Sequence, residues 1–580
     1  MNDSPPGGVC INPPFGSRAY WRLFVPKLFI MLSRGYDASD LRHDAIAGLT
    51  VAIIALPLAM ALAIASGTTP DKGLVTAVVA GFLISAVGGS RFQIGGPTGA
   101  FVVVVFDTIA RHGYDGLLLA TLIAGVILIA AGLARLGTWI KYIPDPVVTG
   151  FTAGIAVIIA ASQIKDLLGL PIAKVPAHFI DKWPVFIAHL HESSVASIAI
   201  ALLAFAIILA LRRFAPRAPG YLIAVLVVSV VAAVAVLPVA TIGSEFGELP
   251  NRLPLPAWPV FSFERVREVV PSAFTIAFLA GVESLLSAMV ADGMTGARHR
   301  SNIELVGQGV ANCASALVGG MPATGAIART ATNVRSGARS PVSGMLHAVF
   351  ILLFMLLFAR WASYVPLASL AAILLMVAWT MSEPDKFVHM LRRAPTADRL
   401  ILVTTFVLTV LVDLTFAIEV GVVLAAIAFM HRMAEAVAVQ THVPIIERDI
   451  DDFARPGSSK ETQRAGLPAG VEVYQLRGPL FFGAATRLDD MLAIMRSRPQ
   501  VFILRMGEVP FADATGARAI RNLAADCRRR GTHLILAEVQ LEVREVLSRL
   551  SESGQDAHLH FAGDYRGAVA RAKSLMQAAP

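Results

Sequence analysis

The sequence is poor in charged residues. Asp, Glu, Lys and Arg make up only 16% of its 580 residues, whereas soluble domains usually have about 25%. The deficit is uneven, because long apolar runs fill residues 44–434 and charges return at ordinary density from His442 onward. A protein that is water-soluble throughout is therefore excluded, and the sequence predicts one part in lipid and one in water.

Cysteine is scarce as well. Cys10, Cys313 and Cys527 are far apart and form no Cys-x-x-Cys or Cys/His cluster, which argues against a disulfide framework or a zinc site. The formal net charge of +8 comes mostly from cations in short loops between apolar runs. No basic stripe interleaves with aromatics, so nucleic-acid binding is not expected. We expect no metal and no cofactor.

The apolar part contains about fourteen runs of a length suited to membrane helices. The runs cover residues 45–65, 74–89, 98–111, 117–136, 146–169, 194–211, 219–238, 270–292, 304–318, 325–338, 343–358, 365–381, 399–415 and 417–434. The predicted organisation is an N-terminal tail (1–43), a transmembrane domain (44–434), a linker (435–470) and a soluble domain (471–580). No small-residue cleavage site follows the apolar patch of the tail, which argues against a removed signal peptide.

The loops predict the orientation, because Lys and Arg near segment ends favour the cytoplasm. If the N-terminus is inside, the inside loops hold most of these cations, while an alternate loop carries Glu245 and Glu248. The inside cations are Arg91, Arg135, Lys141, Arg212, Arg213, Arg217, Arg298, Arg300, Arg335, Arg339, Lys386, Arg392, Arg393 and Arg399. Both ends of the membrane domain are therefore expected in the cytoplasm.

Two similar Gly-rich breaks occur, one in each half of the membrane domain. Residues 95–100 read GGPTGA and residues 319–326 read GGMPATGA, and each precedes a short apolar segment. With about seven segments per half, the two copies would have opposite orientations, as in an inverted repeat. The alternative is a chance coincidence in a chain with 46 Gly and 33 Pro.

These breaks predict an anion site. Pro97 and Pro322 suit the first turn of a helix, so each short segment is expected to start within the membrane. The first N–H groups of a helix lack intrahelical partners, and its dipole places partial positive charge there. Small residues keep these N–H groups accessible, and the hydroxyl of Thr98 can donate another hydrogen bond. The small residues are Gly99, Ala100, Gly325 and Ala326. The alternative is a kink where helices cross.

Glu283 is the second signal, because it lies within the apolar run IAFLAGVESLLSAMVADG. An ionisable group at that depth indicates function, since its charged form is costly in hydrocarbon. Burial favours the neutral acid, so Glu283 is a candidate for proton coupling, with Ser287 one turn later on the same face. The alternative is a structural hydrogen bond to the half-helices. Arg329 either attracts anions or makes a structural pair.

From Val471 the pattern changes to short β-rich runs that alternate with helical ones, including a helical stretch at 485–495. This pattern predicts an α/β domain with a mainly parallel sheet. No Gly-rich phosphate loop or catalytic spacing appears, so an enzyme is not expected. Asp513 precedes Thr515 at a strand-to-helix junction. Asp513 either caps the helix or belongs to a site of phosphorylation or partner docking at Thr515.

The sequence resembles the SulP (sulfate permease) family of anion transporters over residues 40–580, with a C-terminal STAS domain. The motifs that carry the resemblance are DAIAGLTVAIIALPLAMALAIASG, GGPTGA, ESLLSAMVADGMTG, ELVGQGVAN and DATG. The resemblance implies seven plus seven inverted segments, divided into a core and a gate domain, and a homodimer. It also implies contact between the anion and Thr98 and a regulatory role at the position of Thr515.

Within the family, GGSRF, GFTAGI, QIKDLLGL, ATGAIART, TNVRSGA and MVAWTMSE resemble bacterial C4-dicarboxylate carriers, which implies the bacterial inner membrane. Sodium–bicarbonate members have Asp, Thr and Thr where this chain has Glu283, Ser287 and Ile327. Because Ile327 offers no oxygen ligand, protons are favoured over sodium. The expected function is proton-coupled symport of a C4-dicarboxylate or sulfate. Sodium-coupled bicarbonate transport and an anion exchanger or channel are the alternatives.

Overall fold

The computed structural model describes residues 17–33, 35–138, 144–172, 175–176, 178–215, 218–248, 250, 252–412, 414–436, 438–441, 467–468, 470–481, 499–549 and 559–577. The chain divides into two compact units between Val422 and Val423. This division falls inside a helix, and the predicted domain limits at 43, 434 and 470 stay predictions.

The first unit is built from helices, apart from two very short strands. The helices are α1 (Arg18–Arg22), α2 (Lys27–Ser33), α3 (Ala38–Ala65), α4 (Pro70–Val87), α5 (Gly99–Leu133), α6 (Asp145–Ser162), α7 (Ile164–Leu168), α8 (Phe179–Ala188), α9 (Val195–Phe214), α10 (Gly220–Val234), α11 (Ile242–Phe246), α12 (Phe263–Thr295), α13 (Ser301–Leu317), α14 (Ile327–Arg335), α15 (Val342–Ala362), α16 (Leu367–Met381), α17 (Pro384–Arg393), α18 (Thr396–Leu411) and α19 (Leu414–Ala436), with 3-10 turns at Leu136–Thr138 and Leu190–Glu192.

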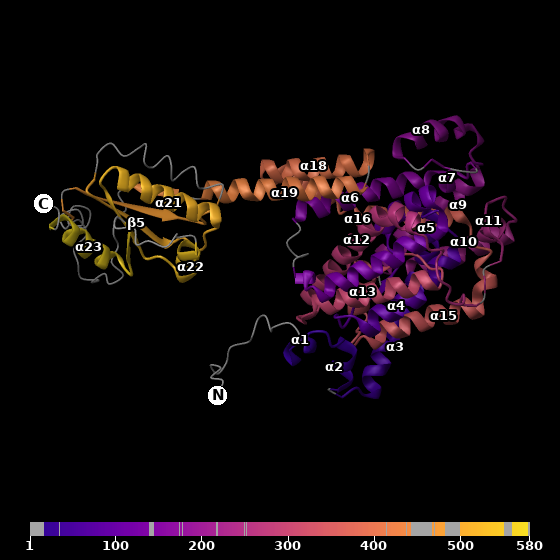
Figure 1. Ribbon diagram of the computed structural model, residues 1–580. Coiled ribbons are helices and arrows are strands. Elements are labelled where there is room, and N and C mark those ends of the chain that lie inside the picture. Colours follow the sequence, from indigo (N-terminus) through magenta and orange to yellow (C-terminus); the bar gives the residue numbers. More distant parts are fainter. Residues whose placement is uncertain are drawn as a thin grey trace. The chain divides into compact units, whose positions relative to one another are not determined.

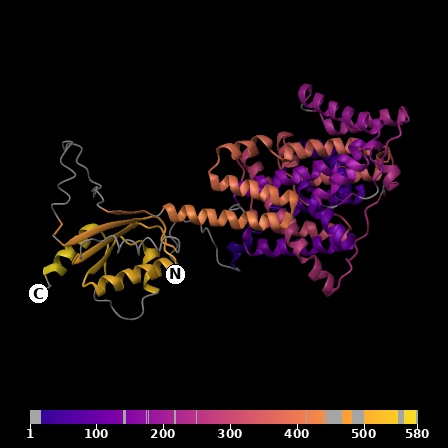
Figure 2. The same ribbon diagram turned by 90° about the horizontal axis from the view of Figure 1, so that it is seen from above.

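Long apolar helices dominate this unit and run beside one another as a bundle (Figures 1 and 2). Within the described part of the chain, nine helices are long and apolar enough to cross a membrane. Such helices satisfy their own backbone hydrogen bonds, which is what a segment in lipid requires. The prediction of a mostly helical membrane protein is confirmed.

Two predicted segments, 98–111 and 117–136, are joined in the single element α5. Gly113 interrupts it with φ +71° and ψ 179°, so the chain changes course there. Glycine tolerates this positive φ because it has no Cβ. Another predicted segment, 146–169, is divided into α6 and α7 at Gln163.

The Gly-rich breaks form the short strands β1 (Gly95–Gly96) and β2 (Thr324–Gly325). They pair antiparallel, with Gly95 opposite Gly325 and Gly96 opposite Thr324. The helices α5 and α14 start just after the strands, at Gly99 and Ile327. The expectation that Pro97 and Pro322 occupy the first helical turns is therefore wrong, because Pro97 lies between β1 and the extended N-cap residue Thr98, and Pro322 lies before β2.

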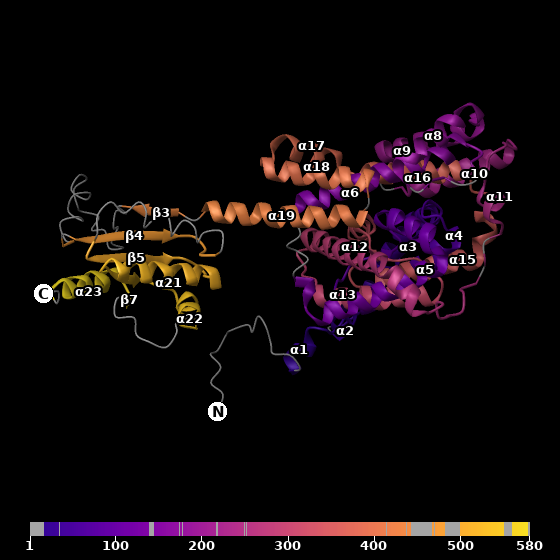
Figure 3. The same cartoon turned by 45° about the horizontal axis from the view of Figure 1, so that its top comes forward.

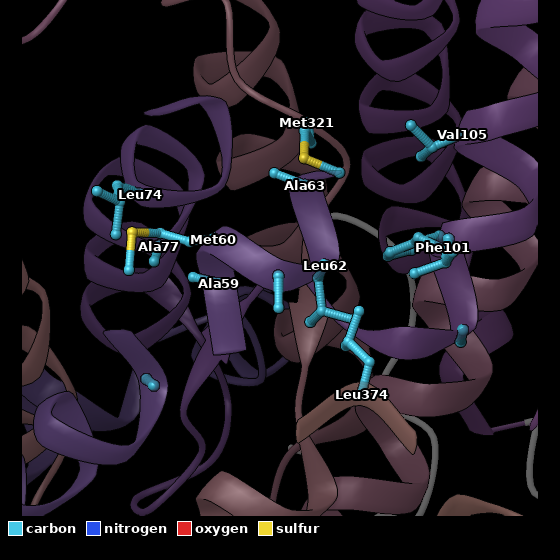
Figure 4. Close-up of a cluster of buried hydrophobic side chains, with 14 of the residues drawn as sticks. Ala59, Met60, Leu62, Ala63, Leu74, Ala77, Phe101, Val105, Met321 and Leu374 are labelled. Atoms are coloured by element: carbon cyan, nitrogen blue, oxygen red, sulfur yellow. The ribbon is translucent and has the colours of Figure 1, made fainter. Parts of the chain in front are cut away.

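The C-terminal part of α3 lies in the hydrophobic core of the first unit. Figure 4 shows its Ala59–Ala63 segment among side chains of α4, α5 and α16 and of the loop before β2. Leu62, Leu74 and Phe101 are each at most 1% exposed. This packing surrounds the first turn of α5, since Phe101 follows Gly99 by two residues, and it holds the broken helix in place.

Helices α5 and α13 approach closely through facing glycines. A Cβ built on Gly125 would lie 2.7 Å from the Gly309 carbonyl oxygen, and one on Gly309 would lie 2.5 Å from the Gly125 carbonyl oxygen. Small residues at such crossings let membrane helices pack backbone against backbone. The crossing fixes α13 against the helix that carries the first break.

The second unit contains a five-stranded sheet in the order β3-β4-β5-β6-β7. The strands are β3 (Ala438–Thr441), β4 (Val471–Arg477), β5 (Val501–Glu508), β6 (His533–Ala537) and β7 (Leu559–Ala562), and the helices are α21 (Ala514–Arg529), α22 (Leu541–Arg549) and α23 (Tyr565–Gln577). Figure 3 shows β3, β4 and β5 side by side. Only β3 is antiparallel to its neighbour among these pairs, which confirms the mainly parallel sheet.

The sheet buries both faces, as parallel sheets do. Alternate residues of β5 point to opposite sides: Phe502 and Leu504 pack with α21 and α22, whereas Val501 and Ile503 pack with α23. The helix predicted at 485–495 lies outside the described residues.

Candidate functional site

The two breaks meet inside the first unit. Beyond the pairing of β1 with β2, the backbone N–H of Ala326 donates to the carbonyl oxygen of Ile94 at 2.9 Å. The N-termini of α5 and α14 are thus brought to one place by segments more than 200 residues apart in the chain. Thr98 and Gly325 lie in this junction, and a shared binding pocket there stays a prediction.

Thr98 is the N-cap residue of α5, in an extended conformation with φ −126° and ψ 161°. Its hydroxyl does not cap its own helix but donates to Glu283 Oε2 at 2.8 Å. No described group accepts from the N–H of Gly99 or Ala100, which belong to the open first turn of α5. Donors and a carboxyl group therefore stand together at this end.

The N-terminus of α14 differs from the expectation. Because Ile94 accepts the N–H of Ala326, the prediction that this N–H is accessible is wrong. The open first turn begins instead at Ile327, whose side chain is 38% exposed. Gly325 is buried in the strand pair, where a side chain would collide with Gln93. Gly325 shapes the backbone, whereas Ile327 faces open space.

Ser287 is fully buried and its hydroxyl donates to Thr330 Oγ1 at 3.0 Å. The same Thr330 oxygen accepts the backbone N–H of Ile94 at 3.1 Å. Ser287 therefore lies beside the junction, as predicted, but its observed contact ties α12 to α14. Thr330 was not predicted, because its only local signal is its position in the first turn of the second broken helix.

Arg329 reaches from α14 to the first break. Its Nη2 donates to the Pro97 carbonyl oxygen at 2.8 Å, and its side chain is 3% exposed. Its Nε and Nη1 have no hydrogen-bond partner among the described residues. A Cβ on Gly96 would lie 2.6 Å from Nη1, so glycine is needed there. The guanidinium both joins the breaks and adds positive charge behind them.

A buried polar network supports the junction from one side. Glu304 accepts the N–H groups of Gly89 and Ser90 at 2.7 and 3.0 Å. Ser284 donates to Glu304 at 3.2 Å and accepts from Gln93 at 2.8 Å. Gln93, Ser284 and Glu304 were not predicted, because their roles depend on partners roughly 190 to 215 residues away.

The first turn of α5 also faces two other helices. A Cβ on Gly99 would lie 3.1 Å from Met381 Sδ and 3.4 Å from Ile159 Cδ1. Met381 ends α16 and Ile159 lies near the end of α6. Gly99 is thus a place where the broken helix lies directly against neighbours outside the junction.

Thr515 lies far along the chain in the second unit, in the first turn of α21. The helix is capped by Asp513, whose Oδ1 accepts the N–H of Gly516 at 2.7 Å. Thr515 itself is half-buried. The capping role considered for Asp513 is therefore present, and phosphorylation or docking at Thr515 stays a prediction.

Comparison with known proteins agrees with this architecture. The sulfate permease family model matches residues 41–405, and the STAS domain model matches residues 466–555. The putative sulfate transporter YvdB of Bacillus subtilis is 42% identical over 534 residues, which cover 91% of this chain and 97% of that relative. The bicarbonate transporter BicA of Picosynechococcus is 30% identical over 523 residues, covering 88% and 91%.

The structure of the murine Slc26a9 anion transporter has the same fold, with a TM-score of 0.83 over 97% of this chain and 96% of that chain at 18% identity. The relatives are named as transporters, which confirms that the chain is not an enzyme. They are named for sulfate or bicarbonate, so the expected closeness to C4-dicarboxylate carriers is not supported. The chain therefore belongs to the sulfate permease family and is a multi-pass membrane anion transporter with a C-terminal STAS domain.

Proposed function

We propose that this chain is a proton-coupled symporter of a divalent anion, either sulfate or a C4-dicarboxylate, that works by alternating access. The observation that carries the proposal is the 2.8 Å hydrogen bond from Thr98 at the start of α5 to Glu283 on α12. It joins an anion-attracting helix end to a carboxyl group that can take up a proton.

The anion would rest at the open helix ends. The first turns of α5 and α14 supply unpaired N–H groups and partial positive charge. The buried guanidinium of Arg329 adds a full charge beside them. Thr98 can turn its hydroxyl from Glu283 to the anion, which makes it a contact residue alongside Gly99 and Ile327.

Coupling follows from charge repulsion. An ionised Glu283 beside a dianion is a like-charge pair, which disfavours the charged carboxylate. A proton on Glu283 removes this repulsion, so proton and anion favour one another's binding. The relation is reciprocal, because each ligand must change the affinity for the other by the same factor. Anion and proton would therefore move together.

The two dianions differ in how they use Ile327. A C4-dicarboxylate has an apolar middle that an exposed isoleucine can contact, while sulfate has none. The name of the YvdB relative instead favours sulfate. Both therefore belong in the same experiment.

Sodium-coupled bicarbonate transport is the second candidate, because of the BicA relative. Sodium needs several oxygen ligands, whereas Ile327 has an apolar side chain and Ser287 is engaged with Thr330. An exchanger or channel of the same fold would use the helix ends but would not need a protonatable Glu283.

We further propose a homodimer in the bacterial inner membrane with both termini in the cytoplasm. Two contacts support this orientation by joining segments expected on one side. Arg339 pairs with Asp40 at 2.9 Å, and Arg300 donates to the Arg22 carbonyl oxygen at 3.0 Å. In this orientation the STAS domain is cytoplasmic, where Thr515 would be available to a kinase or a protein partner.

The test is uptake of labelled sulfate, succinate and bicarbonate into proteoliposomes with an imposed pH gradient, with and without sodium. We expect accumulation of sulfate or succinate when the outside is acidic, independent of sodium. Uptake that follows the sodium gradient supports the second candidate instead. Equilibration without accumulation supports an exchanger or channel, and contradicts coupling.

A further inference from the structure

A cavity of about 780 Å³ lies at the end of the first unit where α3 ends and α4 begins. Its wall includes Val102 and Val103 of α5, one turn beyond Gly99. It continues along α5 to Asp107 and Arg111 and is closed on another side by α7 and α8. The cavity thus extends along α5 toward the start of that helix.

Lys182 of α8 faces this cavity and is only 4% exposed. The opposite face of α8 carries Ile180, Trp183 and Ile187, which are 57%, 41% and 69% exposed. A surface lysine usually extends its charged end into water. Here the apolar side of the helix is outside and the lysine is turned inward.

The ammonium group of Lys182 has no hydrogen bond or ion pair with any described residue. Its one described interaction is with the Phe106 ring, whose centroid lies 5.9 Å from Nζ. Burial lowers the pKa of Lys182 to about 8, and no neighbouring carboxylate offsets that effect. A buried cation without a counter-charge costs several kcal/mol, so such groups are normally paired.

The other cations of the wall, Lys72, Arg111 and Lys165, differ from Lys182, because each interacts with a carboxylate; that of Lys165 is its neighbour Asp166. Arg111 pairs with Asp107 at 2.9 Å, and Lys72 lies 3.8 Å from Asp71 and over the Tyr114 ring. Lys182 therefore stands out as a cation whose charge is available to something that enters the cavity. The contact with Phe106 lies near the 6 Å limit for a cation–π interaction, which is worth about 0.5–1 kcal/mol at exposed sites and does not replace an ion pair.

We propose that Lys182 forms an anion-capture site in this cavity, where a small divalent oxyanion or dicarboxylate binds before it passes along α5 to the open helix ends near Thr98. The inference rests on the proposed transport of dianions. A fixed cation in a cavity with low-dielectric walls concentrates counter-ions and raises their rate of entry. The captured anion supplies the negative counter-charge that Lys182 lacks among the described residues.

The first test compares Lys182→Gln with Lys182→Arg in uptake of external sulfate and succinate by intact cells and proteoliposomes. We expect KM to rise about tenfold in Lys182→Gln, the low end of electrostatic steering, with little change in maximal rate. Lys182→Arg should restore KM, and 0.5 M salt should reduce the difference. A KM within about twofold of the parent protein in Lys182→Gln overturns the inference.

A second variant separates charge from folding. Lys182→Cys, modified with aminoethyl methanethiosulfonate, regains an ammonium group at that position, whereas sulfonatoethyl methanethiosulfonate adds a negative charge. We expect the first reagent to restore a low KM and the second to raise KM further, with the treated parent protein as control for the native cysteines Cys10, Cys313 and Cys527. Equal KM after both reagents contradicts capture by charge.

Phe106→Leu tests the ring contact: a KM defect equal to that of Lys182→Gln would assign Lys182 to a structural contact instead.

Binding separates this inference from the proposed function. If the parent protein accumulates no dianion, the proposed function fails, and binding of labelled sulfate to the purified full-length protein then decides the role of Lys182. Weaker binding in Lys182→Gln than in Lys182→Arg supports the capture site. Equal binding in the two variants, or no binding in the parent protein, overturns it.

Discussion

Glu283 and Thr98 form a pair in which one member can change charge and the other cannot. The hydroxyl donates to the carboxyl oxygen, so the contact persists whether or not the second carboxyl oxygen carries a proton. Removing the proton site and removing the hydroxyl should therefore have different effects on transport.

Glu283→Gln keeps an acceptor for the Thr98 hydroxyl but cannot bind a proton. We expect proton-driven accumulation of the anion to be lost while exchange of labelled for unlabelled anion continues. The measurement is uptake under a pH gradient beside counterflow without one. Glu268→Gln, at an exposed position of the same helix α12, is the control. Full accumulation by Glu283→Gln would refute the coupling role.

Thr98→Ala removes a donor at the helix end and leaves Glu283 Oε2 without this partner. We expect the KM for the transported anion to rise about tenfold, the equivalent of about 1.4 kcal/mol for one lost hydrogen bond. Thr98→Ser keeps the hydroxyl and should remain near the parent value. Unchanged saturation in Thr98→Ala would remove this residue from the site.

Lys182 should give external anion uptake a pH dependence of its own. Its pKa of about 8 means that the ammonium is charged below pH 8 and neutral above it. The KM of the parent protein should therefore rise between pH 7 and pH 9 more steeply than that of Lys182→Arg, whose guanidinium stays charged. The other titratable groups of the cavity are common to both proteins: Asp107, Arg111, Tyr114, Lys72, Lys165, Asp166, His178 and Glu245. Parallel pH profiles would contradict this prediction.

At the scale of elements, the apolar runs predicted the helices well and their interruptions less well. Run length and hydropathy are local properties, so α9 and α15 begin and end near the predicted residues and α3 ends at the predicted one, although it begins earlier, at Ala38. The break in α5 depends on one torsion at Gly113, and the short strands next to Pro97 and Pro322 depend on β1 pairing with β2. Neither the torsion nor the pairing can be predicted from the sequence of the segment in which it occurs.

The crossing of α5 and α13 should tolerate no added carbon. Gly309→Ala forces the helices apart or strains them, because its Cβ would lie 2.5 Å from the Gly125 carbonyl oxygen. We expect about 1–3 kcal/mol of destabilisation and a lower melting temperature of the detergent-solubilised protein. Gly293→Ala in α12 is the matched control, since nothing lies within 4 Å of its Cβ. Equal melting temperatures would show that the crossing adapts.

At the scale of the whole molecule, the second unit has cores of its own on both faces of its sheet. A chain fragment from Ala438 to the C-terminus should therefore fold alone and melt cooperatively, as measured by circular dichroism. Leu536→Ala, at a fully buried position of β6, should lower the stability of that fragment by about 2–5 kcal/mol. A fragment without a cooperative transition would mean that this unit depends on the membrane part.

The candidate site, like the fold, could be predicted only where the signal lies within one segment of the sequence. Thr98, Gly99 and Glu283 carry local signals, namely a glycine break and a charge in an apolar run, and the structure brings them together. The contacts of Ser287 and Arg329 are set by partners on other helices, Thr330 on α14 and Pro97 before α5. No spacing within one segment identifies such partners.

The bond from Arg329 to Pro97 ties together two interruptions that are 232 residues apart in the chain. With the Ala326–Ile94 bond beside it, the two halves of the resting place cannot separate without breaking buried polar contacts. The anion would then move together with both broken helices as one rigid unit. The sliding surface would lie at the edge of that unit, where Gly99 faces Met381 and Ile159. A larger side chain at Ile159, on the neighbouring helix α6, should therefore slow transport without weakening anion binding.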